Sequence, residues 1–349
     1  MKRIWLGATV AAFLGACGGG NPFIEEEDTG TGTGTDTGTG TDSDPTLPPG
    51  TASPEPDNSI FRTEPTAASG GQVGDGYVTD VAYNSANDTF TVDNLGFDGD
   101  NVYNRGTAVS SLGPYSVYEA VAQFPDSETG SPINQFTHRA IYGVSTTGNT
   151  QFAIVRTGAY SDYGFGGFIY QREGGVTLPT SGQALFSGEV SGVRDFSGSG
   201  GLQYSRGDID VAIDFDDFND TTGSRGDAVQ GAVYNREIYD IDGNNITNAV
   251  VGAINSDQAA SLTAMPTLTF TVAPGALDDN GEILGEVSSF FVNDAGEVVS
   301  FESGNYYALV SGDAGGPDEI VGVIVTTTDV GQPTGVTVRD TGGFIVYRQ

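Results

Sequence analysis

The stretch GDIDVAIDFD, residues 207–216, decides the fold class of this chain. Apolar Ile209, Val211, Ile213 and Phe215 alternate along it with acidic residues or alanine. Successive side chains of a β-strand point to opposite faces, so the apolar set must face a core while the acids face water or cations. The period of two therefore predicts a β-strand that is buried on one side.

Similar short alternating stretches recur along the chain, separated by Gly, Asn, Asp and Pro. The chain has 53 glycines, 15 tyrosines and 19 phenylalanines, and this composition favours strands and turns over helices. Strands are predicted at residues 115–124, 136–144, 150–157, 167–171, 184–190, 208–217, 228–239, 267–272, 305–310, 319–327 and 343–347. One helix is predicted, at residues 256–265. The predicted fold class is all-β.

The N-terminus has the pattern of a lipoprotein signal peptide. Lys2 and Arg3 precede an apolar run at residues 4–14, which is too short to span a bilayer as a helix. The run ends in LGAC at residues 14–17, which resembles the lipobox of bacterial lipoproteins, and Cys17 is the only cysteine. We therefore expect residues 1–16 to be removed and Cys17 to carry the lipid. Gly18, in place of the aspartate that retains lipoproteins at the inner membrane, favours the outer membrane, and either leaflet remains open.

Residues 17–58 are predicted to be the lipidated cysteine and a disordered tether. The segment is acidic, rich in Gly, Thr and Pro, and nearly devoid of apolar side chains. Such a composition cannot bury enough surface to offset the entropy of ordering. As a flexible coil it would span roughly 35 Å, which is enough to hold a folded domain clear of lipid headgroups.

Composition excludes several classes of chemistry. The only lysine and the only tryptophan, Lys2 and Trp5, lie in the predicted signal peptide, and the only histidine is His138. These counts leave no Schiff-base lysine, thiol nucleophile or Cys/His zinc site. His138 lies in an alternating stretch and is interpreted as a strand histidine. The formal net charge of −33 argues against nucleic acid as a partner.

The second half of the chain resembles the β-barrel lobe of transferrin-binding protein B-like surface lipoproteins. The resemblance rests on ordered motifs: LPTSGQALFSG at 178–188, DVAIDF at 210–215 with VQGAV at 229–233, GNYY at 304–307 with EIVGV at 319–323, and GGF at 342–344. It implies an antiparallel barrel lobe of about eight strands at residues 178–349. A smaller antiparallel handle-like region would precede it, at residues 59–177.

The resemblance also implies a function. Proteins of this family are tethered, catalytically inert modules that bind a protein or nutrient, often beside a TonB-dependent receptor. The expected contacts of this chain are therefore a membrane, through the lipid, and a protein partner. The loops that would bind transferrin are not matched here, so transferrin binding is not implied.

Aromatic side chains in Gly-rich loops are the candidate binding residues. Tyr160, Tyr163 and Phe165 lie in the Gly-rich segment 158–167, and Tyr306 and Tyr307 are adjacent near the end of the chain. Tyrosine offers apolar area together with a hydroxyl group, and loops on a rigid scaffold are where such residues make contacts. The alternative is that these aromatics belong to the core.

Calcium is the one ion for which the sequence offers candidate ligands, and no other cofactor is expected. Asp98 and Asp100 form one cluster of oxygen ligands, and Asp240, Asp242 and Asn244 form another. Neither matches a twelve-residue EF-hand loop. Asp, Asn and Gly also form turns without any metal, so both interpretations stay open.

Two alternatives to a binding module remain. One is a structural or adhesive envelope lipoprotein stiffened by calcium. The other is a β-rich hydrolase that uses paired carboxylates. Asp208, Asp210 and Asp214 share a strand face, where neighbours lie about 7 Å apart, within the spacing that glycosidases use.

Overall fold

The computed structural model describes residues 46–219, 223–312 and 316–349. The predicted signal peptide, Cys17 and most of the predicted tether lie outside these residues. These described residues form one compact unit. Its first part contains β1 (Ile60–Thr63), the 3-10 helix η1 (Ala67–Ser69), β2 (Val81–Asn84), β3 (Thr89–Val92), β4 (Val102–Arg105), β5 (Ser111–Leu112), β6 (Tyr115–Glu119), β7 (Gln123–Pro125), β8 (Pro132–Asn134), β9 (His138–Val144), β10 (Thr150–Thr157) and β11 (Gly167–Arg172).

The second part begins with three long strands that follow one another directly. Its elements are β12 (Gln183–Ser197), β13 (Leu202–Asn219), β14 (Ser224–Asp240), α1 (Thr247–Gln258), β15 (Leu268–Phe270), β16 (Ala273–Pro274), β17 (Glu282–Val292), β18 (Val298–Ser311), β19 (Glu319–Thr328) and β20 (Thr337–Arg348). The all-β prediction is therefore confirmed.

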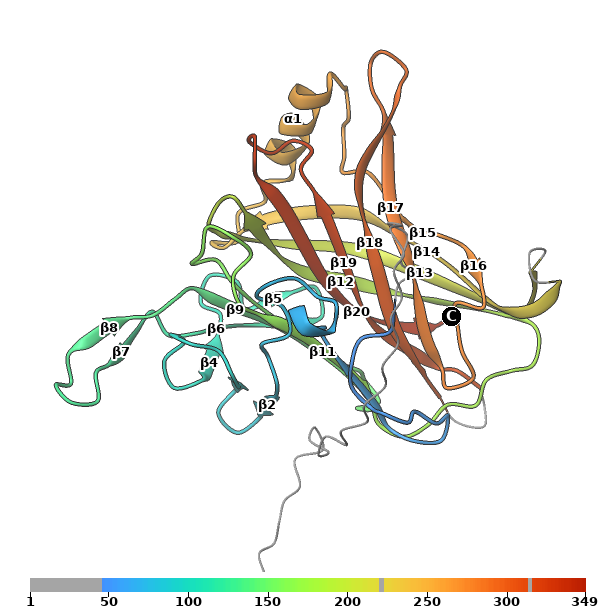
Figure 1. Cartoon of the computed structure of the whole chain (residues 1–349), viewed down its shortest axis with the longest axis horizontal. Helices are drawn as coiled ribbons and strands as arrows, with labels where there is room; N and C mark the ends of the chain where they lie inside the picture. Colours follow the sequence, from blue (N-terminus) through green and yellow to red (C-terminus); the bar gives the residue numbers. More distant parts are fainter. Residues whose placement is uncertain (1–45, 220–222, 313–315) are drawn as a thin grey trace, which may run out of the picture. The chain divides into compact units, whose positions relative to one another are not determined.

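The second part closes into an eight-stranded antiparallel barrel (Figure 1). Neighbouring strands run in the order β12, β13, β14, β15, β17, β18, β19 and β20, and β20 pairs again with β12. The short β16 pairs with β14 outside this ring. Closure removes the free strand edges that an open sheet would leave.

The strand at 207–216 behaves as its alternation predicts. Ile209, Val211, Ile213 and Phe215 are each at most 4% exposed and belong to the apolar core inside the barrel. The acidic side chains of the same strand lie on its other face and are partly exposed. The period of two therefore identified the buried face of β13.

One end of the barrel interior is charged, so the interior is not apolar throughout. Arg236 forms a bidentate pair with Glu302, with 3.1 Å between Nη2 and Oε2. Arg194 Nε lies 3.6 Å from Asp340 Oδ2, and the Ser205 hydroxyl donates to Asp340 at 2.7 Å. Burial works to raise the pKa of Glu302, but the Arg236 guanidinium outweighs it and holds the pKa below its usual value.

The first part forms a second antiparallel sheet that covers the outside of the barrel. Its strands run in the order β1, β11, β10, β9, β6, β4, β3 and β2, with β5 on β6, while β7 and β8 form a separate hairpin. Ile154 and Phe168 of this sheet share a core with Val193, Val321 and Ile345 on the outer face of the barrel. Strand β19 is consequently buried on both faces over most of its length.

A glycine lets the two sheets approach closely. A Cβ added at Gly343 on β20 would lie 2.2 Å from the ring of Phe152 on β10, so any larger residue would displace that ring. Tyr115 of the covering sheet also reaches the barrel wall. Its hydroxyl donates to Glu189 O at 2.7 Å and accepts from Ile345 N at 2.7 Å.

The ordered chain begins before the predicted end of the tether at residue 58. Thr63 N donates to Pro49 O at 2.9 Å, and Val176 N donates to Pro56 O at 2.7 Å. Proline lacks the N–H needed to continue a ladder but can accept at a sheet edge. The Pro-rich segment therefore has the composition of a linker while its described residues, 46–58, lie against β1 and the chain after β11.

The helix predicted at 256–265 is wrong in position. The structure places the helix earlier along the chain, at Thr247–Gln258 (α1). Val251 and Ile254, three residues apart, bury one face of α1 against Phe291 and Phe301 of the β17–β18 hairpin. Ala259 adopts a left-handed conformation with φ 48° and ends the helix. No helix in the described part of the chain has the length and apolarity needed to cross a membrane.

Acidic side chains crowd one mouth of the barrel, and this predicts a pH effect. Partial burial, with Asp279, Asp214 and Asp216 nearby, raises the pKa of Asp227 from 3.8 to about 6. The folded state therefore holds this proton more tightly than the unfolded state, and the stabilisation is lost as the pH rises through about 6. Asp227→Asn should raise the melting temperature at about pH 8 and change it little at about pH 4. A pH-independent effect in calorimetry would contradict this origin.

Candidate binding surface

The Gly-rich segment 158–167 connects β10 to β11 and is held by backbone hydrogen bonds at several points. Gly158 N donates to Thr137 O at 3.0 Å, Gly198 N donates to Ser161 O at 2.7 Å, and Tyr77 N donates to Gly166 O at 2.9 Å. A Cβ at Gly164 would lie 2.3 Å from the methyl group of Thr157, which explains a glycine there. The segment is therefore a fixed support for its three aromatic side chains.

Tyr163 faces the barrel. Its ring lies 4.5 Å from the guanidinium carbon of Arg339 on β20, a cation–π contact. Its hydroxyl is buried without a hydrogen-bond partner in the described structure, and burial raises its pKa to about 12. Tyr163 therefore anchors the segment, and its buried hydroxyl is not available to a partner.

Tyr160 and Phe165 lie in a continuous series of five rings, which we call the aromatic row. Ring centroids are separated by 4.6 Å for Tyr77–Phe165, 5.2 Å for Phe165–Tyr160, 5.1 Å for Tyr160–Phe136 and 4.8 Å for Phe136–Phe97. Tyr77 is 41% exposed and Phe97 is 61% exposed, and the three rings between them are partly buried. Three of these contacts are edge-to-face and the Phe136–Phe97 contact is tilted, and such packing fixes the rings relative to one another.

Three members of the aromatic row were missed by the sequence prediction: Tyr77, Phe97 and Phe136. They come from segments far apart in the chain, and no local pattern marks them. One conformational signal singles out Phe97, whose φ of 58° is unusual for a bulky residue. Such strain persists only where surrounding contacts impose it, and it is concentrated at functional sites.

A hollow of about 320 Å³ lies next to the aromatic row. Phe136, Gln135 and Thr137 line one part of it, and Glu119 and Arg139 line another. Glu119 and Arg139 form an ion pair, with 3.1 Å between Oε2 and Nη2. The hollow therefore combines an apolar ring with polar groups that already have partners.

The structure does not bring Tyr306 and Tyr307 to this surface, so the prediction that they share a binding patch with Tyr160 is wrong. Tyr306 is 1% exposed inside the barrel, with its ring 4.1 Å from that of Phe270. Tyr307 points to the opposite face of β18 and packs under the covering sheet, near Phe168. Adjacent residues of a strand point to opposite faces, and both faces of β18 are covered at this level.

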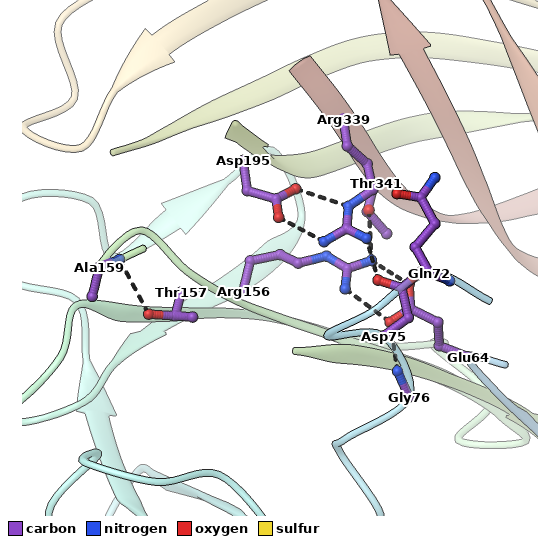
Figure 2. Close-up of polar contacts among 10 residues, drawn as sticks. All are labelled: Glu64, Gln72, Asp75, Gly76, Arg156, Thr157, Ala159, Asp195, Arg339 and Thr341. Carbon is purple, nitrogen blue, oxygen red and sulfur yellow. Dashed lines mark hydrogen bonds and ion pairs between the residues drawn. The ribbon is translucent and has the colours of Figure 1, made fainter. Parts of the chain in front are cut away.

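A buried ionic cluster lies behind the segment, between the covering sheet and the barrel (Figure 2). Arg156 on β10 contacts Glu64, with 2.8 Å between Nη1 and Oε2. Arg339 on β20 forms a bidentate pair with Asp195 on β12, at 3.0 and 2.6 Å, and also contacts Asp75. Five charged side chains from five segments thus meet, each less than a tenth exposed.

The carboxyl groups of this cluster respond differently to burial. Burial tends to raise the pKa of Glu64, but the Arg156 guanidinium and its hydrogen bonds outweigh it and keep the pKa below its usual value. For Asp75, burial and the neighbouring Glu64 carboxylate raise the pKa despite Arg339. The cluster has three carboxyl groups for two guanidinium groups, so Asp75 shares Arg339 with Asp195 and has no guanidinium of its own.

The predicted calcium ligands form turns. Asp240 accepts hydrogen bonds at 3.0 Å from Asp242 N and at 2.8 and 2.9 Å from the backbone and side-chain nitrogens of Asn244. Asp98 is buried and accepts from the Tyr103 hydroxyl at 3.2 Å, whereas Asp100 is exposed. Among the described residues, no group of three or more His, Cys, Asp or Glu side chains is placed to hold a metal ion.

The candidate catalytic acids of β13 each accept a hydrogen bond from a neighbouring strand. Asn235 donates to Asp208 at 2.7 Å, Tyr234 donates to Asp210 at 3.1 Å, and Gln183 donates to Asp214 at 2.7 Å. These contacts show that each carboxylate pairs with a side chain of a neighbouring strand on the solvent-facing side of the sheet. They do not require the paired-acid chemistry of a hydrolase.

His138, interpreted as a strand histidine, lies in β9 and is 1% exposed. Burial lowers the pKa of its imidazole to about 4. The neutral ring is 3.3 Å from the Phe136 carbonyl oxygen through Nδ1. These contacts describe a packed histidine with no acidic partner.

Several solved structures align with this chain at low similarity. A double mutant of transferrin-binding protein B from Haemophilus parasuis is 14% identical, with a TM-score of 0.34, over 78% of this chain and 45% of that one. The intact Ap-TbpB structure, with N and C lobes, is 11% identical, with a TM-score of 0.36, over 83% and 46%. The chain thus spans about half the length of these proteins.

A third structure is a protein of unknown function of the DUF3598 family from Nostoc punctiforme. It is 10% identical, with a TM-score of 0.18, over 83% of this chain and 88% of that one. No family model matches the sequence, and no curated protein matches it. Similarity at this level does not assign the chain to a family, and the resemblance to transferrin-binding protein B-like lipoproteins stays a prediction.

Proposed function

We propose that this protein is a lipid-anchored, non-catalytic module that binds a protein partner through the aromatic row. The observation that carries the proposal is five mutually packed rings on a backbone fixed by hydrogen bonds, exposed at both ends of the series. Aromatic residues in a rigid setting lose little conformational entropy on binding, and tyrosine is enriched among the few residues that carry most of the binding energy at protein interfaces.

The support beneath the aromatic row favours a binding role. The ionic cluster and the shared core join the covering sheet to the barrel, so the segment 158–167 rests on two sheets at once. A preorganised surface binds more tightly than one that must order itself on contact. The barrel and its cover would then act as a scaffold, with the binding residues on its loops.

Photo-crosslinking tests the proposed surface. Benzoylphenylalanine replacing Tyr160 in the full chain, in its native cells, should yield a discrete protein adduct. The same probe replacing Phe290, which is 53% exposed on the β17–β18 hairpin, is the matched control. The adduct should disappear when Phe97→Ser is added to the Tyr160 probe. Identical adducts from both positions, or none from Tyr160, would contradict the proposal.

Outer-membrane anchoring through Cys17 is the second part of the proposal, and the leaflet that carries the protein is left open. It is supported by the LGAC pattern and by the absence of any other cysteine. Cys17→Ala should release the protein from the membrane fraction or leave its signal peptide uncut. Membrane partitioning of this variant at the wild-type level, measured by fractionation and metabolic palmitate labelling, would show that the anchor is not on Cys17.

A further inference from the structure

Carboxylates flank the rings of the aromatic row in the sequence. Residues 72–101 and 158–167, which carry four of its five rings, contain seven aspartates and no Lys, Arg or His. Asp93, Asp100 and Asp162 are exposed, and they lie within four residues of Phe97 or Tyr160. The segments that carry these rings therefore contain acidic residues and no basic residue.

The arginines closest to the aromatic row neutralise only part of this charge, because Asp93, Asp100 and Asp162 stay exposed. Arg139, beside Phe136 in the hollow, is paired with Glu119, and its side chain is only 15% exposed. Arg105, also in the hollow, is paired with Asp88 at 2.7 Å. Elsewhere, Arg62, Arg156, Arg172, Arg194 and Arg339 are all buried. These arginines contact partners inside the fold, so their positive charge is not available at the surface beside the aromatic row.

We infer that the aromatic row recognises a polypeptide segment rich in arginine, an inference that rests on the proposed function of this surface. A cation within about 6 Å of a ring centroid is attracted by the π electrons, and nearby carboxylates strengthen that attraction. The chain itself contains the same contact twice, with Arg339 over Tyr163 at 4.5 Å and Arg105 over Tyr118 at 4.6 Å.

Charge and geometry also decide between possible occupants. A second copy of this chain, with a net charge of −33, would place carboxylates against carboxylates. A neutral apolar partner would bury Asp93, Asp100 and Asp162 without compensation. Arginine fits better than lysine because its planar guanidinium stacks on rings and pairs with a carboxylate at the same time.

The test measures binding of oligo-arginine, oligo-lysine and oligo-glutamate peptides of equal length to the full-length protein by fluorescence anisotropy. Oligo-arginine should bind most tightly, and salt should weaken its binding. The double variant Tyr77→Leu with Phe97→Leu removes the two exposed rings of the row, leaves the charge unchanged and should weaken oligo-arginine binding about tenfold, from roughly 2- to 5-fold per exposed ring.

Phe290→Leu is the matched control, because it removes an exposed ring at a distant site without changing charge. A larger loss of oligo-arginine affinity in the variant of the aromatic row than in the control supports the inference. Equal losses, or no loss in either, would show that the peptide binds by general attraction to an acidic protein and would overturn it. Equal binding of oligo-glutamate would overturn it as well. Because the crosslinking experiment does not depend on the partner's charge, it can succeed while this test fails.

Discussion

Ile213→Asp should unfold the barrel, or nearly so, whereas Asp214→Asn on the same strand should change stability by less than about 0.5 kcal/mol. Ile213 is 1% exposed among apolar side chains inside the barrel, and the acid would find no partner there. Burying an unpaired charge costs several kcal/mol, which is comparable with the total stability of a domain, about 5–15 kcal/mol.

The two variants differ by one position in β13, so the comparison isolates the face of the strand. Asp214 is partly exposed and accepts hydrogen bonds from the Gln183 side chain and from Asp216 N, of which the amide oxygen of Asn can keep at least one. Urea unfolding followed by near-ultraviolet circular dichroism of the tyrosines measures both variants. Similar midpoints for the two would mean that the assigned inner face of β13 is incorrect.

Arg339→Met should destabilise the fold by about 3–5 kcal/mol, the cost of removing one partner from a buried ion pair. The substitution leaves Asp195 and Asp75 buried together, with Glu64 nearby, and only Arg156 remains to offset three carboxyl groups. It also removes the cation beneath the ring of Tyr163. The loss should appear both in urea unfolding and in weaker crosslinking from position 160.

Adding Asp195→Asn to Arg339→Met should recover part of the lost stability, because it removes one of the uncompensated charges. Arg348→Met is the control: Arg348 is exposed, and among the described residues its side chain makes one hydrogen bond, a 3.4 Å contact with Pro317 O. Its effect should stay below about 0.5 kcal/mol. If Arg339→Met costs no more than this control, the ionic cluster does not hold the two sheets together.

Local patterns were reliable where one face of a strand meets the core and the other meets water. Strand β10 was predicted at its observed bounds, and the inner face of β13 was identified residue by residue. Strand β17 was missed, although its sequence EILGEVSSFFV forms eleven residues of barrel wall. Near its end, β17 has a bulge at Ser289 and Phe290 that shifts its register against β18, which breaks the simple alternation.

The local sequence did not determine the position of the helix, and it left the role of the oxygen clusters ambiguous. The stretch at 256–265 contains small and apolar residues suited to a helix, but the packing of Val251 and Ile254 against the β17–β18 hairpin places the helix earlier. Tertiary contacts outweigh helix propensities of a few tenths of a kcal/mol per residue. The oxygen clusters at 98–100 and 240–244 matched both turns and metal ligands, because Asp and Asn side chains serve both purposes.

Strand alternation and composition alone were sufficient for the all-β class, the apolar face of β13 and the strongly acidic character of the chain. The exposure of each aromatic residue depended on the tertiary structure. Tyr306 lies inside because the barrel closes around it, Tyr307 lies under the second sheet, and Tyr77, Phe97 and Phe136 meet Tyr160 only when distant segments fold together. Alternation places a side chain on one face or the other, but only the packing of whole sheets determines which faces remain exposed to solvent.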